Sequence, residues 1–193
     1  MHCVALSDRD IELLAESGAS VVHCPVSNMR LGCGASPVVK LLKAGVNVAL
    51  GTDGAASACS LSMFEQMRTA GLIAKGFSQD PTELTVNQII RMATINGANA
   101  LKLHCDVGSL AVGKLADLAV IDMSQLVTMP VLDVLSNVIY AVEAQCVHQV
   151  WVSGSLVANI QQEKLLRPDR GKLLTKSNIM SLQYLGKERT YSE

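Results

Sequence analysis

The chain has 193 residues, of which 49% are hydrophobic and 17% charged, a composition typical of a globular protein and unlike that of a disordered one. Its 16 basic and 17 acidic residues give a formal net charge of -1, so we expect no nucleic-acid or membrane surface, because such surfaces need clustered positive charge. No apolar stretch approaches the roughly 20 residues that span a bilayer, and the N-terminus lacks the basic segment and apolar run of a secretory signal.

Helices and short apolar strands alternate over residues 1–102. Capping residues at their starts and glycines at their ends indicate the helices, and uninterrupted runs of apolar residues indicate the strands. In chain order, the predicted elements are a helix from Ser7 to Gly18, a strand over 19–24, a loop that starts at Pro25, a helix from Ser36-Pro37 to Gly45, a strand over 46–50, a helix over 61–75 that Gly76 ends, a helix over 89–95 opened by the capping box Thr85-Val86-Asn87-Gln88, and a helical segment over 98–102 after an interruption at Asn96-Gly97.

The alternation of strands and helices with short links predicts parallel βα units. Fully apolar strands agree with this prediction, because helices cover a parallel sheet on both faces. Residues 1–4 lie where a strand should precede the first helix, yet too little of that strand is present. The sequence therefore indicates a chain that begins in the middle of a repeating unit.

The pattern changes at residue 106. Residues 107–114 are typical of turns and strands, and short strands are predicted over 117–122 and 147–152, the latter followed by a Ser153-Gly154 turn. The stretch from residue 167 onwards is polar, as expected of a tail. We therefore expect three regions: a βα region over 1–105, a small β unit over 106–166, and a C-terminal tail over 167–193.

The six cysteines occur singly, without the close spacing of a zinc ribbon or a redox motif. Cysteine used in this way is typical of small core residues in a reducing compartment. We therefore expect core cysteines and a cytoplasmic protein. The cysteines are residues 3, 24, 33, 59, 105 and 146.

A single carboxylate, Asp53, follows the strand over 46–50 and has small residues on both sides. Side chains at the carboxyl ends of parallel strands point into the mouth of a barrel, where a carboxylate can bind a divalent metal and accept a proton from metal-bound water. His2 and His23 follow the two preceding strands on the same side, so we expect all three groups to converge. The alternative is that Asp53 caps the next helix or stabilises a turn.

The stretch "HCPVSNMRLGCGASPVVKLLKAGVNVALGTDGAAS", residues 23–57, resembles the amidohydrolase superfamily. It is closest to the branch of 5′-methylthioadenosine/S-adenosylhomocysteine deaminases and related chlorohydrolases, in its Ser27-Asn28, its GTDGAAS around Asp53, and the MFEQMR of residues 63–68. The later "VGSLAVGKLADLAVID" and "VHQVWVSGSLV" resemble the small β domain of these enzymes. The resemblance covers roughly residues 1–160.

This resemblance implies an α/β fold: the C-terminal part of a (β/α)8 TIM-type barrel, about strands 6 to 8, followed by part of a small β-sandwich domain. It also implies hydrolytic deamination of an adenosine-type substrate with the help of a divalent metal, which we expect to be zinc. Asp53 matches the aspartate that ligates the metal, contacts the substrate and shuttles the proton. His2 matches the histidine that contacts the hydrolytic water, and His23 matches a motif histidine that we assign to substrate binding.

The sequence also departs from the family pattern. The His-x-His pair of the first barrel strand, the metal histidine of the fifth and the glutamate that follows it are not in this chain, so its metal site is incomplete. Ala58-Cys59 stands where relatives often have two asparagines, which loosens the substrate assignment. We therefore expect a fragment that needs a missing N-terminal half or pairs with a second copy. The open alternatives are a non-catalytic assembly module and a chlorohydrolase or other C–N hydrolase.

Overall fold

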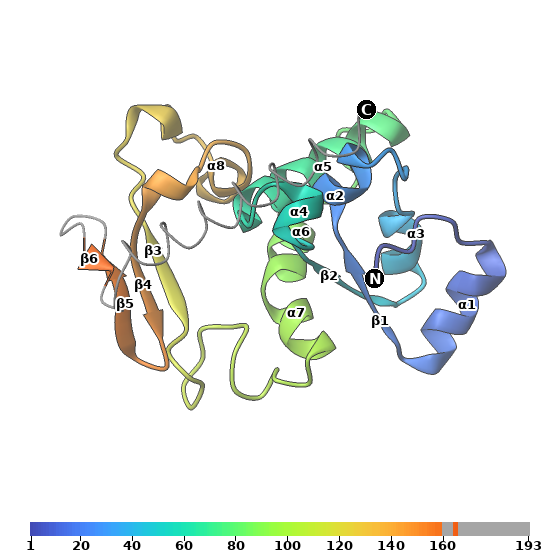
Figure 1. The fold of residues 1–193 in the computed structure, drawn as a ribbon, viewed down its shortest axis with the longest axis horizontal. Coiled ribbons are helices and arrows are strands. Elements are labelled where there is room, and N and C mark those ends of the chain that lie inside the picture. Colours follow the sequence, from blue (N-terminus) through green and yellow to red (C-terminus); the bar gives the residue numbers. More distant parts are fainter. Residues whose placement is uncertain (160–163, 166–193) are drawn as a thin grey trace, which may run out of the picture.

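The computed structural model describes residues 1–159 and 164–165, which form an α/β fold with two separate sheets (Figure 1). Helices α1 (Asp8–Ser17), α2 (Pro25–Arg30) and α3 (Val38–Lys43) alternate with strands β1 (Ser20–His23) and β2 (Asn47–Leu50). Four more helices follow, and then a second, antiparallel sheet. The four helices are α4 (Ala55–Ala58), α5 (Met63–Ser78), α6 (Val86–Ala93) and α7 (Ile95–Ala100).

Strands β1 and β2 are parallel, with Ser20 opposite Asn47 and His23 opposite Leu50. Residues 1–4 do not form the expected strand: His2 and Cys3 have φ angles of 66° and 49°, which an extended chain does not adopt. The His2 amide nevertheless donates to the Val22 carbonyl at 2.9 Å, so this segment runs beside β1. The parallel βα arrangement is thus present, with two full strands.

The two faces of this sheet have different surroundings. Val21, Val48 and Leu50 face the helices and are buried in the main hydrophobic core. On the opposite face, a Cβ atom at Gly51 would lie 2.8 Å from the Val22 side chain, so only glycine fits there. The core partners of the first face come from the surrounding helices, among them Ile11, Leu41, Met67, Ala70, Ile89 and Met92.

The expected helix starts are correct at both capping boxes. Ser7 and Thr85 each accept a hydrogen bond from the third helical residue, whose side chain bonds back to the cap. Gly18 ends α1 in the left-handed conformation, as predicted.

Two predicted helix ends are wrong. Gly76 lies inside α5, which ends instead at Ser78, with Gln79 as a C-cap in the left-handed conformation. The break that we expected at Asn96-Gly97 lies at Thr94, whose hydroxyl donates to the Ile90 carbonyl at 2.7 Å. Asn96 stays helical because its side chain donates to the Val48 carbonyl of β2 at 2.8 Å and leaves its own backbone alone.

Strands β3 (Leu118–Ile121), β4 (Val147–Val152), β5 (Ser155–Asn159) and β6 (Lys164–Leu165) form an antiparallel sheet in that order. Residues 107–114 are turns, not strands. Between β3 and β4 lies α8 (Val134–Tyr140), which the sequence did not predict and which packs on α5 and α6 (Figure 1). The expected tail over 167–193 lies outside the described residues.

The expectation of core cysteines holds for Cys24 and Cys146 only. Cys3 is partly buried, whereas Cys33, Cys59 and Cys105 are exposed. Across the described part of the chain, no helix is both long and apolar enough to cross a membrane.

Two glycines of α5 provide a matched test of this packing. A Cβ atom at Gly71 would lie 2.7 Å from the Tyr140 hydroxyl and 2.9 Å from Ile89 Cδ1, whereas one at Gly76 meets nothing within 4 Å. We expect Gly71→Ala to lower the free energy of unfolding by about 1–3 kcal/mol through overpacking. Gly76→Ala should raise it by about 0.5–1 kcal/mol, because alanine loses less backbone entropy in a helix.

Urea unfolding of both variants checks this pair. A loss of stability in Gly76→Ala would mean that α5 ends near that residue.

Candidate active site

Asp53 lies three residues beyond the end of β2 and adopts a φ of 60°, in the left-handed region that aspartate tolerates better than most residues. The Ser27 hydroxyl lies 2.6 Å from Oδ2, and the Gly54 amide donates to Oδ1 at 2.6 Å. Both carboxylate oxygens therefore have a fixed donor. The side chain keeps 22% of its surface exposed, so it is open on one side.

Asp53 does not cap the following helix. Helix α4 begins at Ala55 with Gly54 as its N-cap residue, and no side chain caps it. The Asp53 carboxylate bonds instead to Ser27, which is 26 residues away in the sequence. A long-range contact of this kind goes beyond local turn stabilisation.

The hydrogen bond from the Ser27 hydroxyl is the largest effect that lowers the pKa of Asp53 below its ordinary value. The bond from the Gly54 amide lowers the pKa further, while desolvation raises it, and the charge of His2 adds a smaller lowering effect. Asp53 is therefore ionised at neutral pH and can accept a proton.

His2 is brought to the same place from the N-terminus. Its Nε2 lies 3.9 Å from Oδ2 of Asp53, and its Nδ1 lies 2.8 Å from Oδ1 of Asn28. The side chain is 40% exposed. The structure thus brings together the two residues that the sequence analysis assigned to catalysis.

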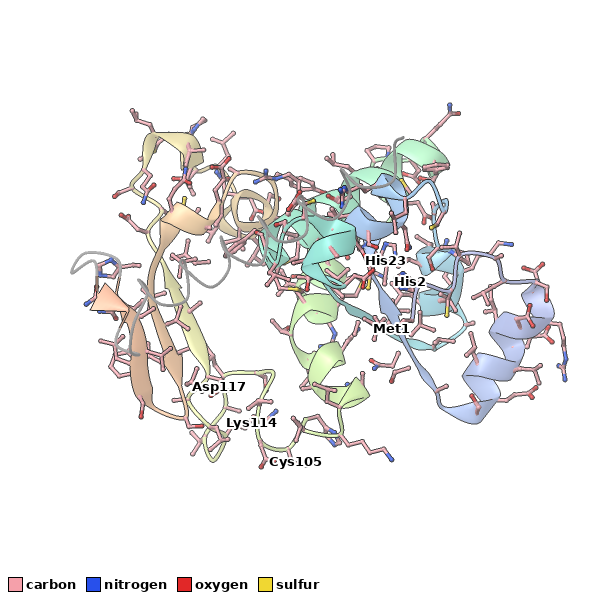
Figure 2. The ribbon with its side chains drawn as sticks, in the orientation of Figure 1. Met1, His2, His23, Cys105, Lys114 and Asp117 are labelled. Carbon is pink, nitrogen blue, oxygen red and sulfur yellow. The ribbon has the colours of Figure 1, made fainter. Side chains whose placement is uncertain are left out.

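His23 has a different environment. Figure 2 labels it near His2, but its side chain is only 2% exposed, and its strand position is opposite Leu50, whose side chain faces the helices. Its Nδ1 has no hydrogen-bond partner among the described residues. Burial, with the nearby His2 as a smaller cause, lowers the pKa of His23 to about 4, so the imidazole is neutral at pH 7. Its substrate-binding role stays a prediction.

Sequence reasoning noted Ser27 and Asn28 as part of a motif but gave them no role. Both lie in α2, a helix that we expected to be a loop, and both side chains are 1% exposed. Arg30 fastens this helix to α4 by donating to the carbonyls of Ala56 and Ser57 at 3.0 and 2.7 Å. The signal available in the sequence was the polar Ser27-Asn28 pair, which follows an apolar strand and Pro25.

The Asp53 carboxylate, oriented by two hydrogen-bond donors, is of the type that serves as one ligand of a metal site. Within the described ranges, no three His, Cys, Asp or Glu side chains come close enough to hold a metal ion. Catalytic zinc usually takes three protein ligands and a water. Asp53 is therefore a single candidate ligand, and the described residues do not by themselves form a three-ligand metal site.

The amidohydrolase family matches residues 1–157. A 5-methylthioadenosine/S-adenosylhomocysteine deaminase of Moorella thermoacetica is 47% identical over 156 residues, which are 81% of this chain and 36% of the relative. A 5′-deoxyadenosine deaminase of Methanosarcina mazei is 42% identical over 173 residues, which are 90% of this chain and 39% of the relative. The chain therefore spans about two fifths of the length of these curated relatives.

Two groups of solved structures share the fold. An adenosine deaminase from Xanthomonas campestris with bound zinc has a TM-score of 0.89 and 41% identity, and the match covers 98% of this chain and 42% of that one. An atrazine chlorohydrolase from Arthrobacter aurescens complexed with zinc has a TM-score of 0.82 and 25% identity, with 92% and 39% covered.

The burial of His23 predicts a dependence of stability on pH. The unfolded chain binds a proton at this imidazole below about pH 6.5, whereas the folded chain does so only near pH 4. The stabilisation is therefore complete above pH 6.5 and is lost as the pH falls towards 4, by up to about 3 kcal/mol. We expect His23→Asn to remove this part of the pH dependence.

Urea unfolding at pH 7 and pH 4.5 gives the loss of unfolding free energy for wild type and for the variant. The carboxylates, which both proteins share, contribute equally to the two losses, so the difference between the losses reports on His23. The exposed His104→Asn is the matched control and should behave as wild type. Equal losses in wild type and His23→Asn would contradict the burial effect.

Proposed function

The chain belongs to the amidohydrolase family, and on that premise we propose that it is the C-terminal part of a metal-dependent hydrolase that deaminates an adenosine-type nucleoside. Methylthioadenosine and S-adenosylhomocysteine are the substrates that the relatives' names favour. The observation that carries the proposal is the approach of His2 Nε2 to Asp53 Oδ2, at 3.9 Å, from two segments that are 51 positions apart in sequence.

Asp53 acts as general base and then as general acid. Its ionised carboxylate takes a proton from the hydrolytic water as the oxygen adds to the purine carbon, and it delivers that proton to the amino group, which leaves as ammonia. His2 contacts the same water and holds it in line. Asp53 would hold part of a divalent metal site, with zinc as the expected metal. When bound, the metal would lower the pKa of the hydrolytic water.

The same proposal places the chain within the complete fold. Strands β1 and β2 are the seventh and eighth barrel strands, and residues 1–4 are the end of the sixth. The antiparallel sheet is part of a small β-sandwich domain over 106–166, with the barrel part over 1–105. His23 lies at the end of β1, but its imidazole is buried on the helix-facing side of the sheet, so its substrate-binding role stays a prediction.

A chlorohydrolase is the second candidate, because structural relatives at 25–26% identity include one. The curated relatives at 42–47% identity carry deaminase names, which favours ammonia as the leaving group. The non-catalytic assembly module, a homo-oligomer and a cytoplasmic location stay predictions.

Joining this chain to the preceding part of the Moorella thermoacetica relative tests the reaction. We expect the joined protein to release ammonia from methylthioadenosine. Asp53→Asn should lower kcat by about 10²–10⁴-fold, because the amide cannot accept the proton. The 193-residue chain alone should show no turnover, because its described residues hold no set of three metal ligands.

The exposed Asp8→Asn, which breaks only the surface pair with Lys40, is the matched control and should keep full activity. Undiminished ammonia release by Asp53→Asn would exclude Asp53 from the reaction. Release of chloride from a chlorinated triazine, without release of ammonia, would favour the second candidate.

A further inference from the structure

The two proposed catalytic side chains are each held by one member of an adjacent, buried pair. Asn28 contacts His2 Nδ1 at 2.8 Å, and Ser27 contacts Asp53 Oδ2 at 2.6 Å. We propose that Ser27 and Asn28 are the positioning residues of this site: Asn28 sets the tautomer of the His2 imidazole, and Ser27 sets the rotamer of the Asp53 carboxylate. This inference rests on the proposed function for its meaning.

The pair is held rigidly. Proline at the first helical position opens α2, and the Asn28 amide donates to the Cys24 carbonyl at 3.0 Å. The Val26 amide donates to Gln66 Oε1 of α5 at 3.3 Å, and Arg30 binds α4 at the other end of the helix. Adjacent helical residues point in directions about 100° apart, so each member of the pair reaches a different partner.

Asn28 determines which imidazole nitrogen carries the proton. The Asn28 oxygen Oδ1 faces His2 Nδ1, and an amide oxygen only accepts, so the proposed arrangement has Nδ1–H as the donor. A neutral imidazole has one N–H, and Nε2 is therefore left with its lone pair on the side that faces Asp53. A lone pair at this position can accept a hydrogen bond from the hydrolytic water.

Ser27 determines where the carboxylate points. An ionised carboxylate only accepts hydrogen bonds, so the Ser27 hydroxyl donates. The oxygen that it binds, Oδ2, is the one nearest to the His2 imidazole, while the Gly54 amide holds Oδ1. Two donors on different oxygens fix both the direction and the plane of the Asp53 side chain.

The tautomer of His2 can be read from ¹⁵N spectra of the histidine-labelled 193-residue chain, which has only four histidines. His2→Gln assigns the signals. We expect protonated Nδ1 and unprotonated Nε2 in wild type at about pH 8. Asn28→Leu should lose this pattern, whereas Asn28→Asp, which keeps an accepting oxygen, should retain it.

The matched control is Asn96→Leu, which removes another buried amide but should leave the His2 tautomer unchanged. Protonation of Nε2 in the wild type would overturn the role of Asn28, even if no variant folds. Retention of the Nδ1–H tautomer in Asn28→Leu would also overturn it.

Three-bond couplings across the Asp53 side chain test Ser27 in the same samples. We expect one χ1 rotamer in wild type and in Ser27→Thr, which keeps the hydroxyl, and averaged rotamers in Ser27→Ala. A single rotamer in Ser27→Ala, or averaged rotamers in wild type, would overturn the role of Ser27. Neither readout needs turnover, so failure of the deaminase assay and failure of this proposal are distinguishable.

Discussion

The geometry of the site depends on one constrained carboxylate. Asp53 follows β2 in a left-handed backbone conformation, which turns the chain sharply and leaves the side chain beside α2. The Ser27 hydroxyl and the Gly54 amide give this negative charge its two short hydrogen bonds, one to each oxygen. With them, it is ionised, oriented and within 4 Å of an imidazole that arrives from the N-terminus.

The sheet beneath the site explains why its elements can come so close. Gly51, directly after β2, lies against the Val22 side chain of β1. A side chain at position 51 would collide with Val22, so glycine lets the two strands stay close at this point. On the other face, Val21, Val48 and Leu50 join a core in which α1, α3, α5 and α6 all take part. The candidate site thus lies at the ends of two strands whose spacing is fixed by packing.

Three helices near Asp53, the short α2 and α4 and the longer α5, do most of the positioning. Helix α2 supplies Ser27 and Asn28, α4 receives Arg30 from α2, and α5 holds the amide of Val26 through Gln66. Helix α5 also connects the two regions of the chain, because Arg68 donates to the Val142 carbonyl at 3.0 Å and Gly71 packs closely against Tyr140. The small β unit is therefore anchored to the same helix that supports the site.

The sequence by itself determined the βα order, the helix caps at Ser7 and Thr85, and the position of Asp53 shortly after a strand, because caps and apolar runs are local patterns. It failed where a distant contact overrides local preference. Asn96 bonds to β2 while remaining helical, and α2, which was expected to be a loop, is tied to α5 through Val26 and to α4 through Arg30. Gly76 also continues a helix, although it has no such contact. Only the tertiary structure decided that Ser27 and Asn28 hold the two catalytic candidates and that His23 is buried among the helices. These facts depend on which segments meet in space, and a run of residues does not encode a partner 26 positions away.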